Sequence, residues 1–194
     1  NLLLSKSENV SEVSEAVKSV VTIFTDEGHG SGCIISSDGY ILTNYHVVHA
    51  YDTVDIILNS NEEIKAELVR KSEDSDLALL KTDKKFDKSF ILDTTRQTQV
   101  GKTVYSIGTG MDIELGQSLS KGIISGKRKF GYNEYLQTDV TINAGGSGGA
   151  LINQNGNLIG IVSAKMFGLG VEGIGFAIPV KSAYKALNLK YNDQ

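Results

Sequence analysis

The stretch "INAGGSGGALI", residues 142–152, places four glycines around Ser147 and then continues into apolar sequence. Glycine loses more conformational freedom on folding than any other residue, so such a cluster marks backbone that needs a positive φ or a close approach. One interpretation is a turn between two strands. The other is a nucleophile loop that presents Ser147 to a substrate and leaves nearby N–H groups free to bind developing negative charge. The stretch alone leaves both interpretations open.

Two other stretches supply the partners that a serine nucleophile needs. "ILTNYHVV", residues 41–48, places His46 directly after a strand-like run, and "SEDSDLALLK", residues 72–81, places Asp76 at the head of an apolar strand. A serine hydroxyl needs a base to take its proton and a third group to hold that base in the right tautomer. The order His, Asp, Ser is the order found in chymotrypsin-type proteases. The three stretches together favour the nucleophile loop.

Each of these residues also has an ordinary structural explanation. A single histidine such as His46 is more often structural than catalytic, and Asp74 competes with Asp76 for the carboxylate role. We prefer Asp76 because burial of the apolar run that follows it would shield the carboxylate. His29, in the loop "DEGHGSG", and His49 are weaker candidates for the base, because neither directly follows a strand.

Length and composition exclude several classes of protein. The chain has 194 residues, enough for one domain or two small ones, and its net charge of −4 argues against a nucleic-acid binder. The single cysteine, Cys33, excludes an internal disulfide and a cysteine-built metal site. An anion-binding glycine loop is disfavoured because no lysine follows the glycines and no helix pattern begins there. We therefore expect no cofactor and no metal.

The beginning of the chain, "NLLLSKSENVSEV", has neither an initiator methionine nor a complete signal-peptide pattern. We interpret it as the cut end of a longer protein, from which an anchor or a further domain would be missing. No run approaches the roughly 20 apolar residues of a membrane-spanning helix, so a membrane contact would need a segment absent from this chain. "NLLL" either packs against a neighbouring subunit or is a frayed terminus.

Short β-rich runs separated by turn signals predict an all-β fold. Glycine occurs 21 times, proline once and tryptophan not at all. The polar segment 83–99 is the best candidate for a linker, and it divides twelve predicted strands into two sets of six. Short helices are expected at about 10–17 and from Pro179 to about 187. The predicted strands are 20–25, 31–36, 40–44, 53–58, 64–71, 77–82, 103–108, 117–125, 134–138, 150–152, 158–164 and 174–178.

Five stretches in order resemble the protease domain of the HtrA, or Deg, family of the chymotrypsin-like clan: "GSGCIISSDGYILTNYHVV", "DSDLALLK", "TDVTINAGGSGGALIN", "GNLIGIVSA" and "GIGFAIPV". The resemblance runs from about Val13 to Leu187. It implies one trypsin-like protease domain over 1–194, made of two perpendicular six-stranded β-barrels, at about 18–90 and 100–180. The family often has PDZ domains after the protease domain, and we expect none within this chain. The resemblance also implies a catalytic triad in the cleft between the barrels.

The resemblance assigns a role to each residue of the proposed site. Ser147 is the nucleophile, His46 the general base and then acid, and Asp76 the orienting carboxylate. The oxyanion hole is expected from the N–H groups of Gly145 and Ser147, with Gly146 between them. The family usually has "GNSGG", so Gly146 is a departure, and we predict that the hole is partly misaligned until substrate binds. The short connection "TDEGHG" is a second departure, so regulatory contacts made by a long insertion there are not carried over.

The resemblance also suggests where a substrate binds. A peptide is expected to add as a strand along Ser163, Ala164 and Lys165. The first specificity pocket is expected to be walled by Thr141–Gly145, including Asn143, by the segment after Ser163, and by Gly175–Ala177. No acid occurs between Val140 and Ser147, so cleavage after small or medium apolar residues is expected unless Lys165 or Glu172 enters the pocket.

The wider role expected from the family is protein quality control. It implies a serine endopeptidase acting on unfolded proteins or peptides, assembled as a homotrimer and located outside the cytoplasm, in the periplasm or cell envelope. The alternative is a catalytically silent relative that binds unfolded chains as a holdase or scaffold. Gly146 favours this alternative, and the intact set of His46, Asp76 and Ser147 argues against it.

Overall fold

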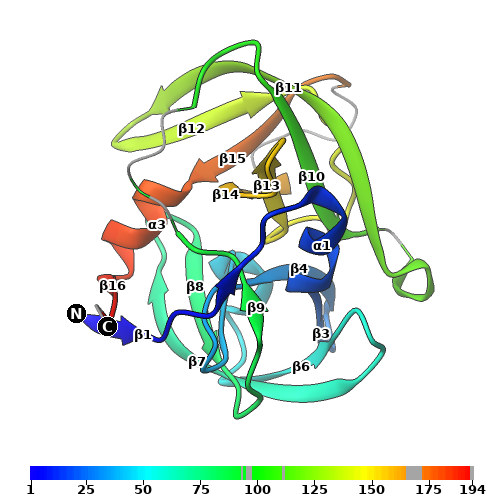
Figure 1. Cartoon of the computed structure of the whole chain (residues 1–194), viewed down its shortest axis with the longest axis vertical. Coiled ribbons are helices and arrows are strands. Elements are labelled where there is room, and N and C mark those ends of the chain that lie inside the picture. The colour runs from blue at the N-terminus through cyan, green and yellow to red at the C-terminus, as the bar shows by residue number, and fades with distance from the viewer. Residues whose placement is uncertain (93, 95–97, 111, 165–171, 193–194) are drawn as a thin grey trace.

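The chain folds into two closed antiparallel β-barrels, one after the other in the sequence (Figure 1). The structure, a computed structural model, describes residues 1–92, 94, 98–110, 112–164 and 172–192. In strand order, the first barrel consists of β3 (Val20–Thr25), β4 (Gly28–Ile34), β5 (Tyr40–Thr43), β8 (Leu77–Lys81), β7 (Glu63–Ser72) and β6 (Thr53–Ile57). The second consists of β10 (Thr103–Thr109), β11 (Gln117–Phe130), β12 (Asn133–Thr138), β15 (Gly175–Pro179), β14 (Leu158–Val162) and β13 (Ala150–Asn153). The prediction of an all-β fold with two six-stranded barrels is confirmed.

Burial along the strands explains why each barrel forms. In β6, Val54 and Ile56 are buried while Thr53 and Asp55 are exposed, the alternation expected of a strand with one solvated face. β8 differs, because all its residues from Leu77 to Leu80 are buried. Ala78 and Leu80 belong to the core inside the first barrel, whereas Leu77 and Leu79 belong to a second core that also contains residues of β10, β13 and β15. This shared core fixes one barrel against the other.

The helices are short and lie outside the barrels. α1 (Val13–Ala16) continues into the 3₁₀ helix η1 (Val17–Ser19), so this helix begins three residues later than predicted. α3 (Val180–Ala186) follows Pro179 as expected. α2 (Tyr45–Val48) and the 3₁₀ helix η2 (Ile113–Leu115) were not predicted. None of the helices in the described part of the chain is long and apolar enough to cross a membrane.

The predicted linker also packs into the fold. Within it, β9 (Lys88–Ser89) pairs in parallel with β2 (Glu8–Asn9). Phe90 is fully buried in the core shared by the barrels, and its N–H donates to the Ile34 carbonyl oxygen at 2.9 Å. The polar composition of the segment concealed these apolar anchors. The described part of the linker therefore contributes to stability as well as joining the barrels.

The two ends of the chain lie side by side (Figure 1). β1 (Leu2–Leu4) pairs in parallel with β16 (Leu189–Tyr191), and Leu4 is fully buried. The Tyr191 hydroxyl donates to the Ile35 carbonyl oxygen at 2.9 Å and accepts from the Leu92 N–H at 3.1 Å. The expectation of a frayed N-terminus is therefore wrong, because the terminus packs against its own chain.

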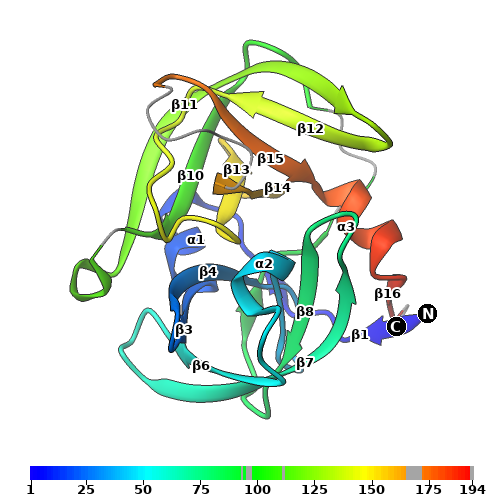
Figure 2. The same cartoon turned by 180° about the vertical axis from the view of Figure 1, so that it is seen from behind.

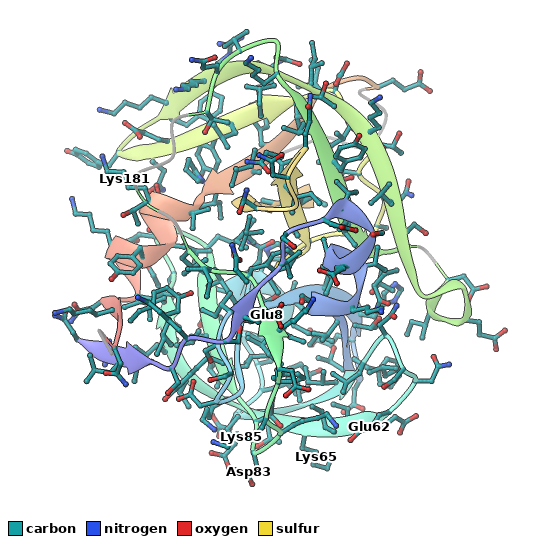
Figure 3. All side chains as sticks on the ribbon, in the orientation of Figure 1. Glu8, Glu62, Lys65, Asp83, Lys85 and Lys181 are labelled. Atoms are coloured by element: carbon teal, nitrogen blue, oxygen red, sulfur yellow. The ribbon has the colours of Figure 1, made fainter. Side chains whose placement is uncertain are left out.

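Charged side chains of both signs lie at the surface. Figure 3 shows Glu62, Lys65, Asp83 and Lys85 together at the end of the first barrel that is far from the second barrel. The Lys84 ammonium lies 2.6 Å from a Glu62 carboxylate oxygen. Exposed ion pairs of this kind contribute little to stability. Their mixed signs agree with the weakly negative net charge.

Candidate active site

The segment around His46 is fixed to Asp76 by the pairing of two strands. β5 ends at Thr43, which pairs with Ala78 of β8, so the residues just outside the strands lie next to each other. The Asn44 side-chain amide and the Tyr45 N–H both donate to the Asp76 carbonyl oxygen, at 3.0 and 3.1 Å. Asp76 has a φ of 51°, in the left-handed region that aspartate tolerates better than most residues. These contacts hold Asp76 against the first turn of α2.

The Asp76 carboxylate binds His46 through both of its oxygens. Oδ2 lies 2.7 Å from the His46 Nδ1, and Oδ1 accepts the His46 backbone N–H at 2.9 Å. Both side chains are partly shielded, with exposed fractions of 26% for His46 and 18% for Asp76. A carboxylate at Nδ1 favours the tautomer that carries its proton there, which leaves Nε2 able to accept a proton.

An aromatic cluster lies near Asp76. Phe130, Tyr135 and Phe176 meet with ring centroids 5.6 to 6.2 Å apart. Burial, with a smaller contribution from the Asp76 charge, raises the pKa of Tyr135. The Asp76 charge therefore acts on one member of this cluster, the Tyr135 hydroxyl.

Among the described residues, the competing candidates form no histidine–aspartate pair, although the His29 ring lies beside Gly145 of the Ser147 loop. The Asp74 side chain is exposed, and its carbonyl oxygen accepts from the Asn133 amide at 2.6 Å. His49 is exposed, with Nδ1 3.2 Å from the His46 carbonyl oxygen. His29 lies in β4, and its Nε2 is 2.7 Å from the Gly110 carbonyl oxygen. His46 and Asp76 are the histidine and aspartate side chains that the structure brings together.

Ser147 lies in the loop between β12 and β13, where three of the glycine N–H groups are bonded. Gly146 donates to Asn143, Gly148 to Val162 and Gly149 to Gly146, each to the carbonyl oxygen at 2.9 to 3.0 Å. Among the described residues, the N–H groups of Gly145 and Ser147 have no hydrogen-bond acceptor. The two unpaired groups are those expected to form the oxyanion hole. Their alignment on substrate binding stays a prediction.

The Ser147 side chain is buried, and its Oγ accepts from the Ala164 N–H at 3.0 Å. Within the described part of the chain, this hydroxyl makes no hydrogen bond to His46, although catalytic hydrogen bonds are often long without substrate. Val47 of α2 and the Ser147 carbonyl oxygen lie on the same side of Gly30, both within 3.3 Å of where a Cβ there would be. Figure 2 shows α2 beside the yellow segment that leads into β13. The loop of the second barrel that carries Ser147 therefore lies close to α2 of the first barrel, which carries His46.

The predicted substrate-binding residues are brought only partly together. Ile142 Cδ1 lies 2.5 Å from where a Cβ of Gly175 would be, and the Ser163 N–H donates to the Phe176 carbonyl oxygen at 3.0 Å. A cavity of about 310 Å³ is lined by Thr141, Ile142 and Asn143 and by residues of β10 and β11. Ser163, Ala164 and Gly175 do not line this cavity, so it lies on the β10 side of the loop. Lys165 lies outside the described residues.

Other residues important to the site received no role from the sequence. Asn44 is fully buried and holds the backbone of Asp76. Ser31 lies in β4 and bonds to the loop that carries Ser147. Both lie inside the long quoted stretch "GSGCIISSDGYILTNYHVV", and Ser31 is flanked by two glycines. The glycine pattern was the available signal for Ser31, but its partner Gly145 in the loop is 114 residues away.

Residues 30–161, which include His46, Asp76 and Ser147, match the family described as the trypsin-like peptidase domain. The periplasmic pH-dependent serine endoprotease DegQ of Escherichia coli strain K12 is 42% identical over 81% of this chain, and the serine endoprotease DegS of Haemophilus influenzae is 40% identical over 81%. The crystal structure of the serine endoprotease from Yersinia pestis is similar with a TM-score of 0.78 and 37% identity, covering 89% of this chain and 62% of that one. The chain belongs to the trypsin-like peptidases and, within them, to the HtrA or Deg protease domains. It spans 36% of the length of DegQ and 48% of the length of DegS.

Proposed function

We propose that this chain is the catalytic domain of a serine endopeptidase that cleaves unfolded proteins or peptides. The observation that carries the proposal is the pairing of the Asp76 carboxylate with His46 Nδ1 at 2.7 Å, opposite a loop in which, among the described residues, the N–H groups of Gly145 and Ser147 are unpaired. A partly shielded carboxylate on Nδ1 stabilises the imidazolium that forms when His46 takes a proton. Ser147 is then the nucleophile that His46 activates.

The proposed reaction follows from the positions of these groups. The Ser147 Oγ attacks the substrate carbonyl carbon as its proton passes to His46 Nε2, and the carbonyl oxygen becomes an oxyanion bound by the N–H groups of Gly145 and Ser147. His46 then gives its proton to the leaving amine, the peptide C–N bond breaks, and an acyl ester remains on Ser147. A water molecule then attacks the ester carbonyl carbon as its proton passes to His46. His46 gives that proton to the Ser147 Oγ as the ester bond breaks, which releases the carboxylic acid product. The Ser147 hydroxyl must first come within hydrogen-bond distance of His46.

The proposed substrate is a peptide with a small or medium apolar residue before the scissile bond. Support comes from Ile142, whose apolar side chain lies against Gly175 in the predicted pocket wall, and from the absence of an acid between Val140 and Ser147. The peptide would pair with Ser163, Ala164 and Lys165, and Asn143 and Thr141 would lie at the pocket wall. A peptide-library profile tests this assignment, and a profile dominated by cleavage after arginine would contradict it.

Assembly and location are proposed from the family. We infer a homotrimer from the family resemblance alone. We also infer a location outside the cytoplasm, which is supported by the relatives that are named periplasmic. Light scattering on the purified chain should give three times its mass of 20.9 kDa. A single-chain mass at micromolar concentration would contradict the trimer without affecting the proposed chemistry.

The competing function is a holdase that binds unfolded chains without cleaving them. One observation favours it, namely that the Ser147 hydroxyl is bonded to the Ala164 N–H and not to His46. Labelling with a fluorophosphonate probe distinguishes the two functions, with Ser147→Ala as the negative control. We expect the unmodified chain to be labelled and to cleave casein. No labelling, with or without an added peptide, would favour the holdase.

A matched pair of histidine variants tests the assignment of the base. His46→Ala should lower kcat by about 10⁴-fold or more, because removing a member of a triad typically has an effect of that order. His49→Ala, three residues along and exposed, should leave kcat near that of the unmodified chain. Equal losses in both variants would show that His46 is not the base.

A further inference from the structure

Ser31 lies in the first barrel but bonds to the loop of the second barrel that carries Ser147. It is fully buried in β4. Its N–H donates to the Ser147 carbonyl oxygen at 2.8 Å, and its hydroxyl donates to the Gly145 carbonyl oxygen at 2.8 Å. The same hydroxyl accepts the Thr109 N–H from β10 at 2.8 Å. One small side chain therefore joins β4, β10 and the loop.

The bond to Gly145 acts on one particular peptide unit. The carbonyl of Gly145 and the N–H of Gly146 belong to the same peptide, and the N–H donates to the Asn143 carbonyl oxygen at 2.9 Å. Both ends of this peptide are thus held, one by Ser31 and the other by Asn143. The peptide lies between the N–H of Gly145 and the N–H of Ser147, so rotating it changes the ψ of Gly145 and the φ of Gly146, two of the torsions that set these N–H groups relative to each other.

Glycine on both sides makes this peptide easy to rotate. Gly145 has a φ of 90°, and neither Gly145 nor Gly146 has a Cβ to restrict the backbone. In a chain with glycine at both positions, the orientation depends on hydrogen bonds rather than on side-chain sterics. The Ser31 hydroxyl supplies one of the two bonds that hold it.

Ser31 is also tied to the segment that carries the base. Its carbonyl oxygen accepts from the Thr43 hydroxyl at 2.7 Å, and Thr43 is the last residue of β5, three residues before His46. The N–H, the carbonyl and the hydroxyl of Ser31 are therefore all engaged. The residue connects the strand that leads to the base with the loop that carries the nucleophile.

We propose that Ser31 is a positioning residue that holds the Gly145–Gly146 peptide in the orientation required for the oxyanion hole. This inference rests on the proposed function. Oxyanion contacts act in the transition state rather than on bound substrate, so loss of the Ser31 hydroxyl should lower kcat and leave KM nearly unchanged. The expected decrease in kcat is about 10- to 100-fold, somewhat less than the effect of removing an oxyanion donor outright.

Thr22 provides a matched control for Ser31→Ala. It lies directly opposite Ser31 in the pairing of β3 with β4, and it is also buried. Its hydroxyl crosses to the same strand, β10, where it lies 2.6 Å from the Thr109 hydroxyl. Thr22→Val therefore removes buried hydroxyl bonds between the first barrel and the second, to Thr109 and from the Gln117 side chain, without touching the loop. Both variants should lose comparable stability, whereas only Ser31→Ala should lose kcat.

The experiment measures kcat and KM on a chromogenic peptide, with active-site titration to count competent molecules and urea unfolding to measure stability. A kcat decrease of about tenfold or more in Ser31→Ala, with KM within about twofold and Thr22→Val near the unmodified chain, supports the inference. A kcat within about twofold of the unmodified chain, or an equal kcat decrease in Thr22→Val, overturns it.

A second variant covers the case in which Ser31→Ala does not fold. Ser31→Cys keeps a side chain of similar shape with a much weaker donor, so a kcat decrease of at least about fivefold is expected. As for Ser31→Ala, KM should stay within about twofold and Thr22→Val should stay near the unmodified chain. Failure of the proposed function itself is recognised separately, because the unmodified chain would then neither hydrolyse the peptide nor react with the fluorophosphonate. That result would remove this inference together with the proposed function.

Discussion

Replacing Gly148 by alanine tests how closely the loop of Ser147 is fitted to the first barrel. Gly148 has a φ of 85°, and a Cβ at this position would overlap the Ser31 carbonyl oxygen and the Thr43 hydroxyl oxygen. Real Cβ atoms essentially never approach other atoms closer than 3.0 Å, so the backbone of β4 or of the loop would have to move. Gly131 is the matched control, because it has a φ of 60° with no atom within 4 Å of the Cβ position.

The two substitutions share the backbone strain but not the overlap. A left-handed conformation costs an L-residue about 1–2 kcal/mol, which is the whole effect expected for Gly131→Ala. Relieving the overlap at Gly148 displaces the Ser31 carbonyl, which accepts from Thr43 at 2.7 Å, and with it the Ser31 N–H, which donates to Ser147 at 2.8 Å. Each buried hydrogen bond contributes about 1 kcal/mol, and more when a partner is left unpaired. We therefore expect Gly148→Ala to lose about 3–6 kcal/mol of unfolding free energy.

Urea unfolding followed by far-ultraviolet circular dichroism measures both variants, since the chain has no tryptophan and eight tyrosines. The difference between the variants should be at least about 2 kcal/mol, or a separation in Tm of roughly 4 °C or more for a chain of this size. A Gly148→Ala chain that does not fold, beside a folded Gly131→Ala chain, gives the same answer. If the two variants lie within about 0.5 kcal/mol of each other, the fit of Gly148 against Ser31 does not constrain the loop.

Three further perturbations test parts of the fold. Phe90→Ala should lose about 3–5 kcal/mol of unfolding free energy because Phe90 is fully buried, whereas Phe24→Ala, at a 44% exposed side chain, should lose much less; similar losses would contradict the packing of the linker. The hydrogen bond from Lys88 holds the pKa of Glu15 below its usual range, so its ionised form stabilises the fold above about pH 4.5 and this stabilisation is lost as the pH falls further. Urea titrations should therefore show a lower free energy of unfolding for Glu15→Gln than for the unmodified chain at pH 7, and this difference should become smaller below pH 4.5. A difference that stays constant with pH would contradict the prediction. Burial raises the pKa of the Cys33 thiol, so a thiol-reactive chromogenic disulfide should react with it only as fast as the chain unfolds, and immediate reaction in buffer would show that the site is accessible.

Most of the strands could be predicted because their signals are local. In β6 the alternation of Val54 and Ile56 with polar residues indicates a strand with one buried face. In β8 the apolar run from Leu77 indicates a strand with two buried faces. Pro179 places the start of α3 by the same kind of local rule, since its fixed φ suits the beginning of a helix. The pairing of His46 with Asp76 follows from neighbouring strand ends, each predicted from its own stretch of sequence.

The errors arose where a few apolar residues lie in polar surroundings. Phe90 and Leu92 occupy a segment whose composition is that of a linker, yet they bury against residues from both barrels. Leu4 and Tyr191 belong to strands of three residues each, and each strand is stabilised only by the other end of the chain. No window of sequence that contains only one of the partners carries the signal for such pairs.

The same reason explains why the chemistry of the site was easier to assign than its support. His46, Asp76 and Ser147 have chemically reactive side chains and lie next to predicted strands or in a glycine-rich stretch. Ser31 is a serine between two glycines, and its hydrogen bonds go to carbonyl oxygens 114 and 116 residues away. The glycines that leave the N–H groups of the loop unpaired also remove the side chains that would fix its backbone. The backbone of such a loop has to be held by hydrogen bonds to residues outside the loop. In this fold the outside support is β4, so the geometry of the proposed oxyanion hole depends on how the two barrels are held together.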